Sequence, residues 1–128
     1  MEVNIPVSLG ELLDKISILE IKNKKILNES KLINIKKELG GLKNVLKELN
    51  INMSEANDLY EDLYEINLTL WEIEDSIRLL EKNKNFGKNF VKLARSVYIT
   101  NDKRFEVKNK INQLFKSQYI EEKSYEDY

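Results

Sequence analysis

The chain has 128 residues, of which 41% are hydrophobic and 34% charged, and its formal net charge is −1. It contains no Cys and no His, which excludes disulfides, thiolate nucleophiles, and the commonest general base and zinc ligand. No apolar run approaches the roughly 18 residues of a membrane span and no signal peptide opens the chain, so we expect a cytoplasmic protein.

The first predicted element is a helix from Leu9 to about Asn28. Ser8 and Glu11 form a capping box at its start, in which the two side chains bind each other's backbone N–H groups. Ile18 and Ile21 lie off the main apolar stripe of this helix. We therefore expect the helix to contact neighbours on two sides.

A second helix is predicted from Lys31 to Leu49, with Ser30 as its cap and apolar residues in a heptad repeat. Gly40 and Gly41 interrupt the repeat. Because two glycines weaken a helix, the pair indicates a kink or the close approach of another backbone. A turn over residues 50–53 predicts an antiparallel hairpin with the next helix.

The third predicted helix, Ser54–Lys82, has two apolar faces. One is a seam at helical spacing, formed by Leu59, Leu63, Ile66, Leu70, Ile73, Ile77 and Leu80. The other is aromatic and lies roughly opposite, formed by Tyr60, Tyr64 and Trp71. The aromatic face is expected to meet another chain, a ligand or the rest of its own chain.

The C-terminal part predicts two shorter helices. The first follows a break near Gly87 and ends at Val97, and the second runs from about Lys103 to Gln118 after a turn over residues 98–102. The tail, residues 119–128, is expected to be flexible or docked through its Tyr side chains. The prediction is therefore an all-α antiparallel helical bundle, a single domain over 1–128, with long N-terminal and central helices.

Charge is strongly segregated along the chain. The segment from Glu55 to Glu81 has nine acidic residues and one Arg, a net charge of −8, whereas Lys82 to Lys116 carries +8 and Ser117 to Tyr128 carries −3. Such blocks favour helices that pair with each other or with a second copy, so we expect a homodimer. Separate solvated faces are the alternative.

Two carboxylate pairs on the third helix raise a metal hypothesis. Asp62 and Glu65, and then Glu72 and Asp75, each stand at i, i+3 on one side of the helix. The arrangement resembles the magnesium sites of all-α nucleoside triphosphate pyrophosphohydrolases, but there the pairs sit on neighbouring helices. We therefore assign no catalytic residue, metal ligand or cofactor, and keep a magnesium-dependent phosphohydrolase as an alternative.

A cluster around the expected turn before the last helix suggests an anion site. Its members are Arg95, Tyr98, Asn101, Asp102 and Arg104. The planar fork of Arg suits phosphate or carboxylate, and a helix N-terminus attracts anions. In the alternative interpretation, the Asn and Asp residues are caps and both Arg residues pair with the acidic third helix.

Four motifs carry a resemblance that spans essentially the whole chain. They are Pro6–Lys22 (PVSLGELLDKISILEIK), Leu70–Arg78 (LWEIEDSIR), Val97–Arg104 (VYITNDKR) and Glu122–Tyr125 (EKSY). With these motifs the chain resembles a short all-helical domain-of-unknown-function family of bacteria and tailed phages, which brings no established activity. Polar residues dominate these motifs, which suggests a site, although caps and buried ion pairs account for some of them: Glu11, Asp14, Lys15, Lys22, Glu74, Asp75, Arg78, Asn101, Asp102, Arg104, Lys123 and Tyr125.

The function we predict is non-enzymatic binding of an anionic small molecule, a nucleotide-like ligand or a phosphosugar. In a phage, sequestering a host signalling nucleotide is one form of this function. The predicted ligand-binding residues are Trp71, Arg78, Arg95, Tyr98, Asn101, Asp102, Arg104, Lys123 and Tyr125. A helical module that binds a protein partner is the main alternative. Nucleic acid is an unlikely partner because no recognition motif is present and the chain is slightly acidic.

Overall fold

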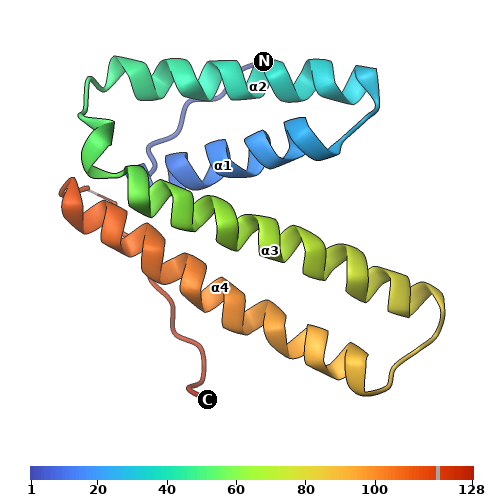
Figure 1. Ribbon diagram of the computed structural model, residues 1–128. Coiled ribbons are helices and arrows are strands. Elements are labelled where there is room, and N and C mark those ends of the chain that lie inside the picture. The colour runs from blue at the N-terminus through green and yellow to red at the C-terminus, as the bar shows by residue number, and fades with distance from the viewer. Residues whose placement is uncertain (118) are drawn as a thin grey trace.

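The computed structural model describes residues 1–117 and 119–128 (Figure 1). Its elements follow in chain order: α1 (Leu9–Lys25), α2 (Glu29–Glu48), the short 3₁₀ turn η1 (Met53–Glu55), α3 (Asn57–Lys82) and α4 (Lys88–Leu114). The predicted all-α bundle is confirmed, and the described residues contain no strand. None of these helices is both long and apolar enough to cross a membrane.

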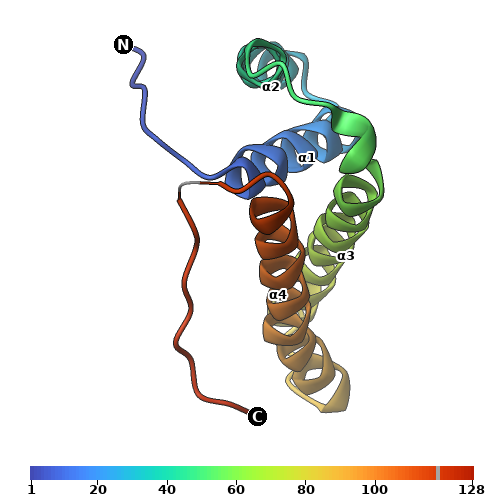
Figure 2. The same ribbon diagram turned by 90° about the vertical axis from the view of Figure 1, so that its left-hand side faces the viewer.

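Helix α1 lies in the middle of the molecule. It packs against α2 on one side and against α3 and α4 on the other (Figures 1 and 2). Ser8 caps it as predicted, since the Ser8 hydroxyl accepts a hydrogen bond from Glu11 N–H at 3.1 Å. Ile21 is only 2% exposed although it lies off the main stripe. The expected contacts on two sides of this helix are thus confirmed.

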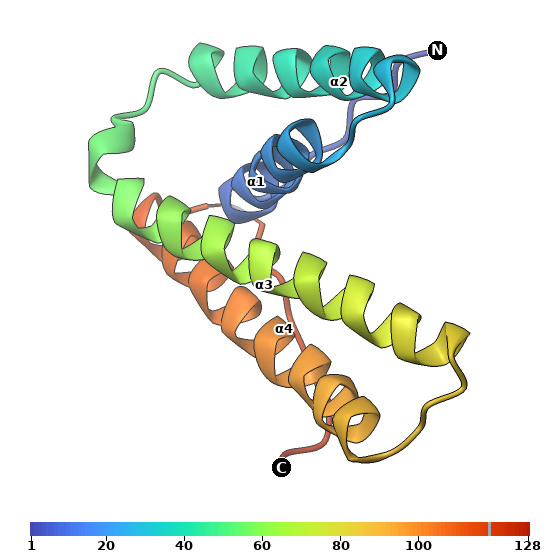
Figure 3. The same ribbon diagram turned by 45° about the vertical axis from the view of Figure 1, so that its right-hand side comes forward.

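Helix α2 packs against α1 and, among the described helices, against no other. Its heptad residues Ile35 and Leu39 are buried in the core cluster. The prediction that the second and third helices form a hairpin is therefore wrong, because α2 buries its apolar stripe on α1 and the chain then turns away towards α3 (Figure 3). Asn28, rather than Ser30, caps α2 by accepting a hydrogen bond from Lys31 N–H at 3.0 Å.

The glycine pair in α2 does not mark a kink or a close approach. The helix continues through Gly40 and Gly41, and a Cβ atom added at either residue would meet nothing within 4 Å. That prediction was wrong because both positions face solvent, where a missing side chain weakens the helix without serving a contact.

The C-terminal part contains one helix instead of two, since α4 runs unbroken through residues 98–102. The expected turn is absent because its polar side chains are engaged elsewhere. Thr100 is buried, Asn101 accepts from Arg104, and Asp102 accepts from Tyr128 of the tail. These side chains therefore do not form the backbone hydrogen bonds that would compete with the helix. Tertiary contacts thus override the local preference of this segment for a turn. The helix ends at Leu114, and the predicted end at Gln118 lies outside the described residues.

Helix α1 covers much of the aromatic face of α3. The Tyr60 hydroxyl donates to Glu20 Oε2 at 2.6 Å, and the Lys24 ammonium lies 5.2 Å from the centre of the Tyr64 ring. The seam on the other side is anchored by Leu63, which is fully buried. The aromatic face was expected to meet another chain, a ligand or the rest of its own chain. The last of these applies to Tyr60 and Tyr64, because α1 of the same chain contacts both.

Charge segregation does not produce ion pairs between α3 and α4, although they lie side by side in antiparallel directions (Figures 1 and 3). Within the described residues, the salt bridges of α4 connect it to α1 and to the tail. The alternative in which Arg104 pairs with the third helix is thus wrong, because Arg104 pairs with Asp14 of α1.

We expect Tyr60→Phe to change how stability depends on alkaline pH. Burial and the hydrogen bond to Glu20 raise the pKa of Tyr60 above its ordinary value of 10.0. Above pH 10 the unfolded state therefore ionises this group while the folded state does not, so folding stability falls. In urea titrations, Tyr60→Phe should cost about 1 kcal/mol at pH 7, and its deficit should shrink steadily above pH 10. A constant deficit would contradict the assignment.

Candidate binding pocket and buried ion pairs

Asp14 is the centre of a buried polar network between α1, α3 and α4. It is 1% exposed, and its carboxylate accepts from Arg104 Nε at 2.9 Å, from Arg104 Nη2 and from Asn67 Nδ2 at 2.9 Å. Ser17 also accepts from Asn67 Nδ2, at 2.8 Å, and donates to the Asp14 backbone carbonyl. Because these donors satisfy the carboxylate, its burial is tolerated.

Lys108, one helical turn beyond Arg104, is 4% exposed and joins α1 to the tail. Its Nζ lies 2.8 Å from Glu11, 2.8 Å from Glu121 and 3.9 Å from Asp14. Burial acts to lower the pKa of Lys108, but the hydrogen bonds to Glu11 and Glu121 outweigh it, so the pKa stands above its ordinary value. The ammonium therefore stays charged at physiological pH.

The start of α1 is fixed on α4 by backbone contacts. Gly10 N–H donates to Asn112 Oδ1 at 2.7 Å, and Leu9 N–H donates to the Ser117 hydroxyl at 3.3 Å. A Cβ atom on Gly10 would lie 2.6 Å from the Lys108 carbonyl oxygen. Only glycine permits this approach, and the approach places Glu11 beside Lys108.

The tail runs as an extended strap along α4 (Figure 2). Lys123 Nζ lies 3.6 Å from Asp102 Oδ1 and 5.2 Å from the centre of the Phe105 ring. Farther along, the Tyr128 hydroxyl donates to Asp102, and the Tyr128 ring meets Tyr98 edge to face at 5.2 Å between centroids. The prediction that the tail docks through its Tyr side chains is therefore confirmed for Tyr128.

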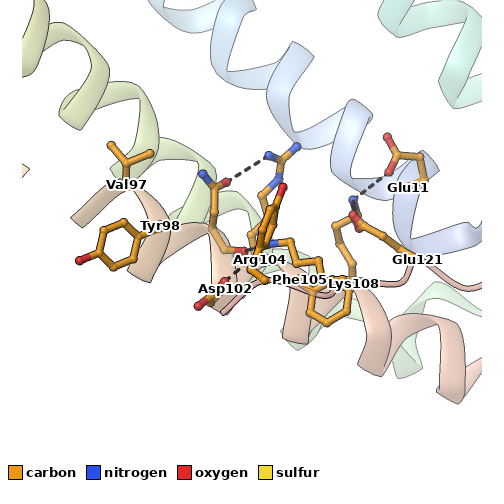
Figure 4. Close-up of a pocket in the computed structure, with 11 residues that line it drawn as sticks. Glu11, Val97, Tyr98, Asp102, Arg104, Phe105, Lys108 and Glu121 are labelled. Atoms are coloured by element: carbon orange, nitrogen blue, oxygen red, sulfur yellow. Dashed lines mark hydrogen bonds and ion pairs between the residues drawn. The ribbon is translucent and has the colours of Figure 1, made fainter. Parts of the chain in front are cut away.

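A pocket of about 570 Å³ lies between α1, α4 and the strap, and we call it the tail pocket (Figure 4). Arg104, Lys108 and Lys123 bring cationic groups to it, and Tyr98, Phe105 and Tyr125 contribute aromatic rings. Six of the predicted ligand-binding residues line this pocket: Tyr98, Asn101, Asp102, Arg104, Lys123 and Tyr125.

A second hollow, of about 480 Å³, holds two more of the predicted residues, Trp71 and Arg78. We call it the Trp71 groove. It shares Asn101 and Arg104 with the tail pocket, so the two hollows adjoin. Arg78 is exposed and donates to Glu74 Oε2 at 2.9 Å. Arg95, the ninth predicted residue, is exposed on α4 and lines neither the tail pocket nor the Trp71 groove.

A family model described as a family of unknown function, DUF6165, matches residues 1–128. The chain belongs to DUF6165. This membership confirms the resemblance to a helical family without an established activity. No curated protein and no solved structure matches this DUF6165 chain.

Sequence reasoning missed Lys108 and Glu121 of this DUF6165 chain as site residues. Asn101, Arg104 and Lys108 stand at spacings of three and four, which places them on one helical face. The signal was present in the sequence, but an expected turn at residues 98–102 separated Asn101 from the helix that holds the other two.

Positive and negative charges balance in the tail pocket. Arg104, Lys108 and Lys123 face Glu11, Asp102 and Glu121, and each cation has a carboxylate within 4 Å. The acidic pairs on α3 are different, because Asp62, Glu65, Glu72 and Asp75 are all exposed. Residues 1–117 and 119–128 contain no group of three or more Asp or Glu side chains arranged to hold a metal ion.

Proposed function

We propose that this DUF6165 chain binds a small anionic molecule in the tail pocket without converting it, as a carrier or a sequestering protein. The observation that supports this proposal is the convergence of Arg104, Lys108 and Lys123 on one pocket with aromatic walls. Its volume of about 570 Å³ falls in the range of small-molecule sites.

The chemistry of the lining favours a ligand with a ring and an acidic group. Tyr98, Phe105 and Tyr125 offer surfaces on which a base or a sugar can stack, and the Arg104 guanidinium suits an acidic oxygen. The Trp71 groove adjoins the pocket through Asn101 and Arg104, which leaves room for a longer ligand. A nucleotide-like molecule or a phosphosugar meets these requirements.

Lys123 is the cation best placed to make the first contact with such a ligand. Its side chain is 25% exposed, similar to the 28% of Arg104, but its polar partners are more distant, at 3.6 Å for Asp102 and 3.5 Å for the Asn101 carbonyl. Arg104, by contrast, is fixed by two hydrogen bonds to the buried Asp14. Replacing Arg104 would therefore disturb the fold as well as the pocket.

We expect Lys123→Gln to weaken the binding of AMP and of glucose 6-phosphate about tenfold, since a hydrogen bond to a charged group contributes roughly 1.5–3 kcal/mol. The measurement is isothermal titration calorimetry, preceded by native mass spectrometry of freshly purified protein to find an adduct. Lys103→Gln, on the exposed side of α4, is the matched control and should leave affinity unchanged. Equal affinities in both variants would remove Lys123 from the site.

A second candidate function is that of a protein-interaction module, which the far end of the α3–α4 hairpin favours. That end extends beyond α1 (Figure 3), and it exposes Leu79, Phe86 and Val91 by 58%, 53% and 53%. Exposed apolar clusters often mark interaction sites. A dimer without an adduct in the mass spectrum, which dissociates in Phe86→Ser, would favour this candidate.

A further inference from the structure

We propose that Glu121 occupies the place of the ligand's acidic group, and that the ligand carries a single negative charge, as a carboxylate or a phosphodiester. On binding, this group takes over the hydrogen bonds of Glu121 with Lys108 and releases the part of the strap around Glu121. The inference rests on the proposed function of the tail pocket, and it adds the ligand's charge and a change in the protein.

The contacts of Lys108 identify Glu121 as the group to be exchanged. Glu121 places both carboxylate oxygens near Lys108 Nζ, at 2.8 and 3.2 Å, as a bound carboxylate or phosphate would. Glu11 and Asp14 also face the ammonium, but both belong to α1, where helix packing holds them. Glu121 lies on the extended strap and not on a helix (Figure 4), and its side chain, at 35% exposed, is about as accessible as that of Glu11 at 39%. It is therefore the most easily displaced carboxylate on Lys108.

The charged side chains around Lys108 indicate which charge the ligand group should carry. Arg104 and Lys108 are positive, whereas Glu11, Asp14 and Glu121 are negative, so the cluster has a net charge of −1. A ligand group with one negative charge restores this balance when Glu121 leaves. A doubly charged group would add an unpaired charge to a largely buried site, where such charges are costly.

The remaining strap contacts explain how binding is coupled to a change in the protein. Lys123 and Tyr128 hold the strap to Asp102, two helical turns from Lys108. The chain between these contacts has no helix, so losing Glu121 removes the anchor at the α1 end of the strap. Ligand binding should therefore raise the mobility of the residues next to Glu121, whereas those between Lys123 and Tyr128 stay held to Asp102.

Fluorescence anisotropy of a labelled strap tests the inference. The chain has no Cys, so Ile120→Cys, at a position that is 59% exposed, gives a single labelling site next to Glu121. We titrate the labelled full-length chain with sodium acetate and with sodium sulfate, which carry one and two charges, at constant ionic strength. Acetate should lower the anisotropy, and sulfate should do so only at about tenfold higher concentration.

Two variants complete the test. Glu121→Gln removes the competing carboxylate, so it should bind acetate about tenfold more tightly, whereas Glu122→Gln, with an exposed side chain next to it, should behave as the parent. Sulfate acting as strongly as acetate, or neither anion lowering the anisotropy, overturns the inference. AMP and glucose 6-phosphate carry about two negative charges at pH 7, so the inference expects AMP to bind more weakly than the singly charged phosphodiester cyclic AMP. If AMP binds in calorimetry as tightly as cyclic AMP, or if either binds without changing the anisotropy, the inference fails while the proposed function stands. If no probe binds the parent or Glu121→Gln by either method, both fail.

Discussion

Asp14→Asn will lower the free energy of unfolding by about 3–5 kcal/mol, because breaking a buried ion pair leaves its partner charge uncompensated. Asp14 is 1% exposed and accepts from Arg104 and Asn67. An amide in its place retains the size of the side chain but not the charge. Arg104 then loses its buried partner, and Lys108 loses one of three neighbouring carboxylates.

Urea denaturation followed by circular dichroism measures this effect. Asp62→Asn, at an exposed position of α3, is the matched control and should stay within about 0.5 kcal/mol of the parent. Combining Asp14→Asn with Arg104→Gln should cost less than the sum of the two single changes, because each removes the same interaction. A loss below about 1 kcal/mol for Asp14→Asn would mean that the pair is not a main source of stability.

Gly10→Ala is the second change with a large expected effect, a loss of about 1–3 kcal/mol or more. The added Cβ atom would lie 2.6 Å from the Lys108 carbonyl oxygen and 2.8 Å from Asn112 Oδ1. The carbonyl belongs to the backbone of α4 and cannot rotate away, so α1 and α4 must separate. The same displacement would draw Glu11 away from Lys108.

The chain provides its own control for this substitution. Gly41→Ala, in the exposed interior of α2 with nothing within 4 Å, should raise the free energy of unfolding by about 1 kcal/mol through helix propensity alone. The same chemical change should thus have opposite signs at the two positions in one denaturation series. Equal effects would show that helix propensity, rather than the contact with α4, governs Gly10.

Sequence patterns predicted those parts of the fold that depend on neighbours along the chain. The capping box at Ser8 predicted where α1 begins, and the spacing of apolar residues predicted the extent of α3. The unbroken α4 was not predicted, because residues 98–102 have the composition of a turn, and the burial of Thr100 and the contacts with Arg104 and the tail are not visible in the sequence. The partner of α2 was also missed, since an apolar stripe does not reveal which helix will cover it.

The candidate site, too, was predicted where it depends on residues close in sequence and missed where it depends on distant ones. Six of nine predicted ligand-binding residues line one pocket, because four of them lie close together on α4 and the tail brings Lys123 and Tyr125 beside them. The pairing of Arg104 with Asp14 spans 90 residues, and that of Lys108 with Glu11 spans 97. No local spacing encodes such pairs. Glu121 was equally out of reach, because its role depends on the path of an extended strap.

These long separations determine when the protein can fold. The ribosome releases α1 first, with the carboxylate of Asp14 still unpaired, and releases Arg104 90 residues later. Because α1 packs on α3 and α4 as well as on α2, a nascent chain that ends before α4 lacks the partners that make burial of Asp14 tolerable. The N-terminal half therefore has to remain unfolded, and open to chaperones and proteases, until α4 has been made.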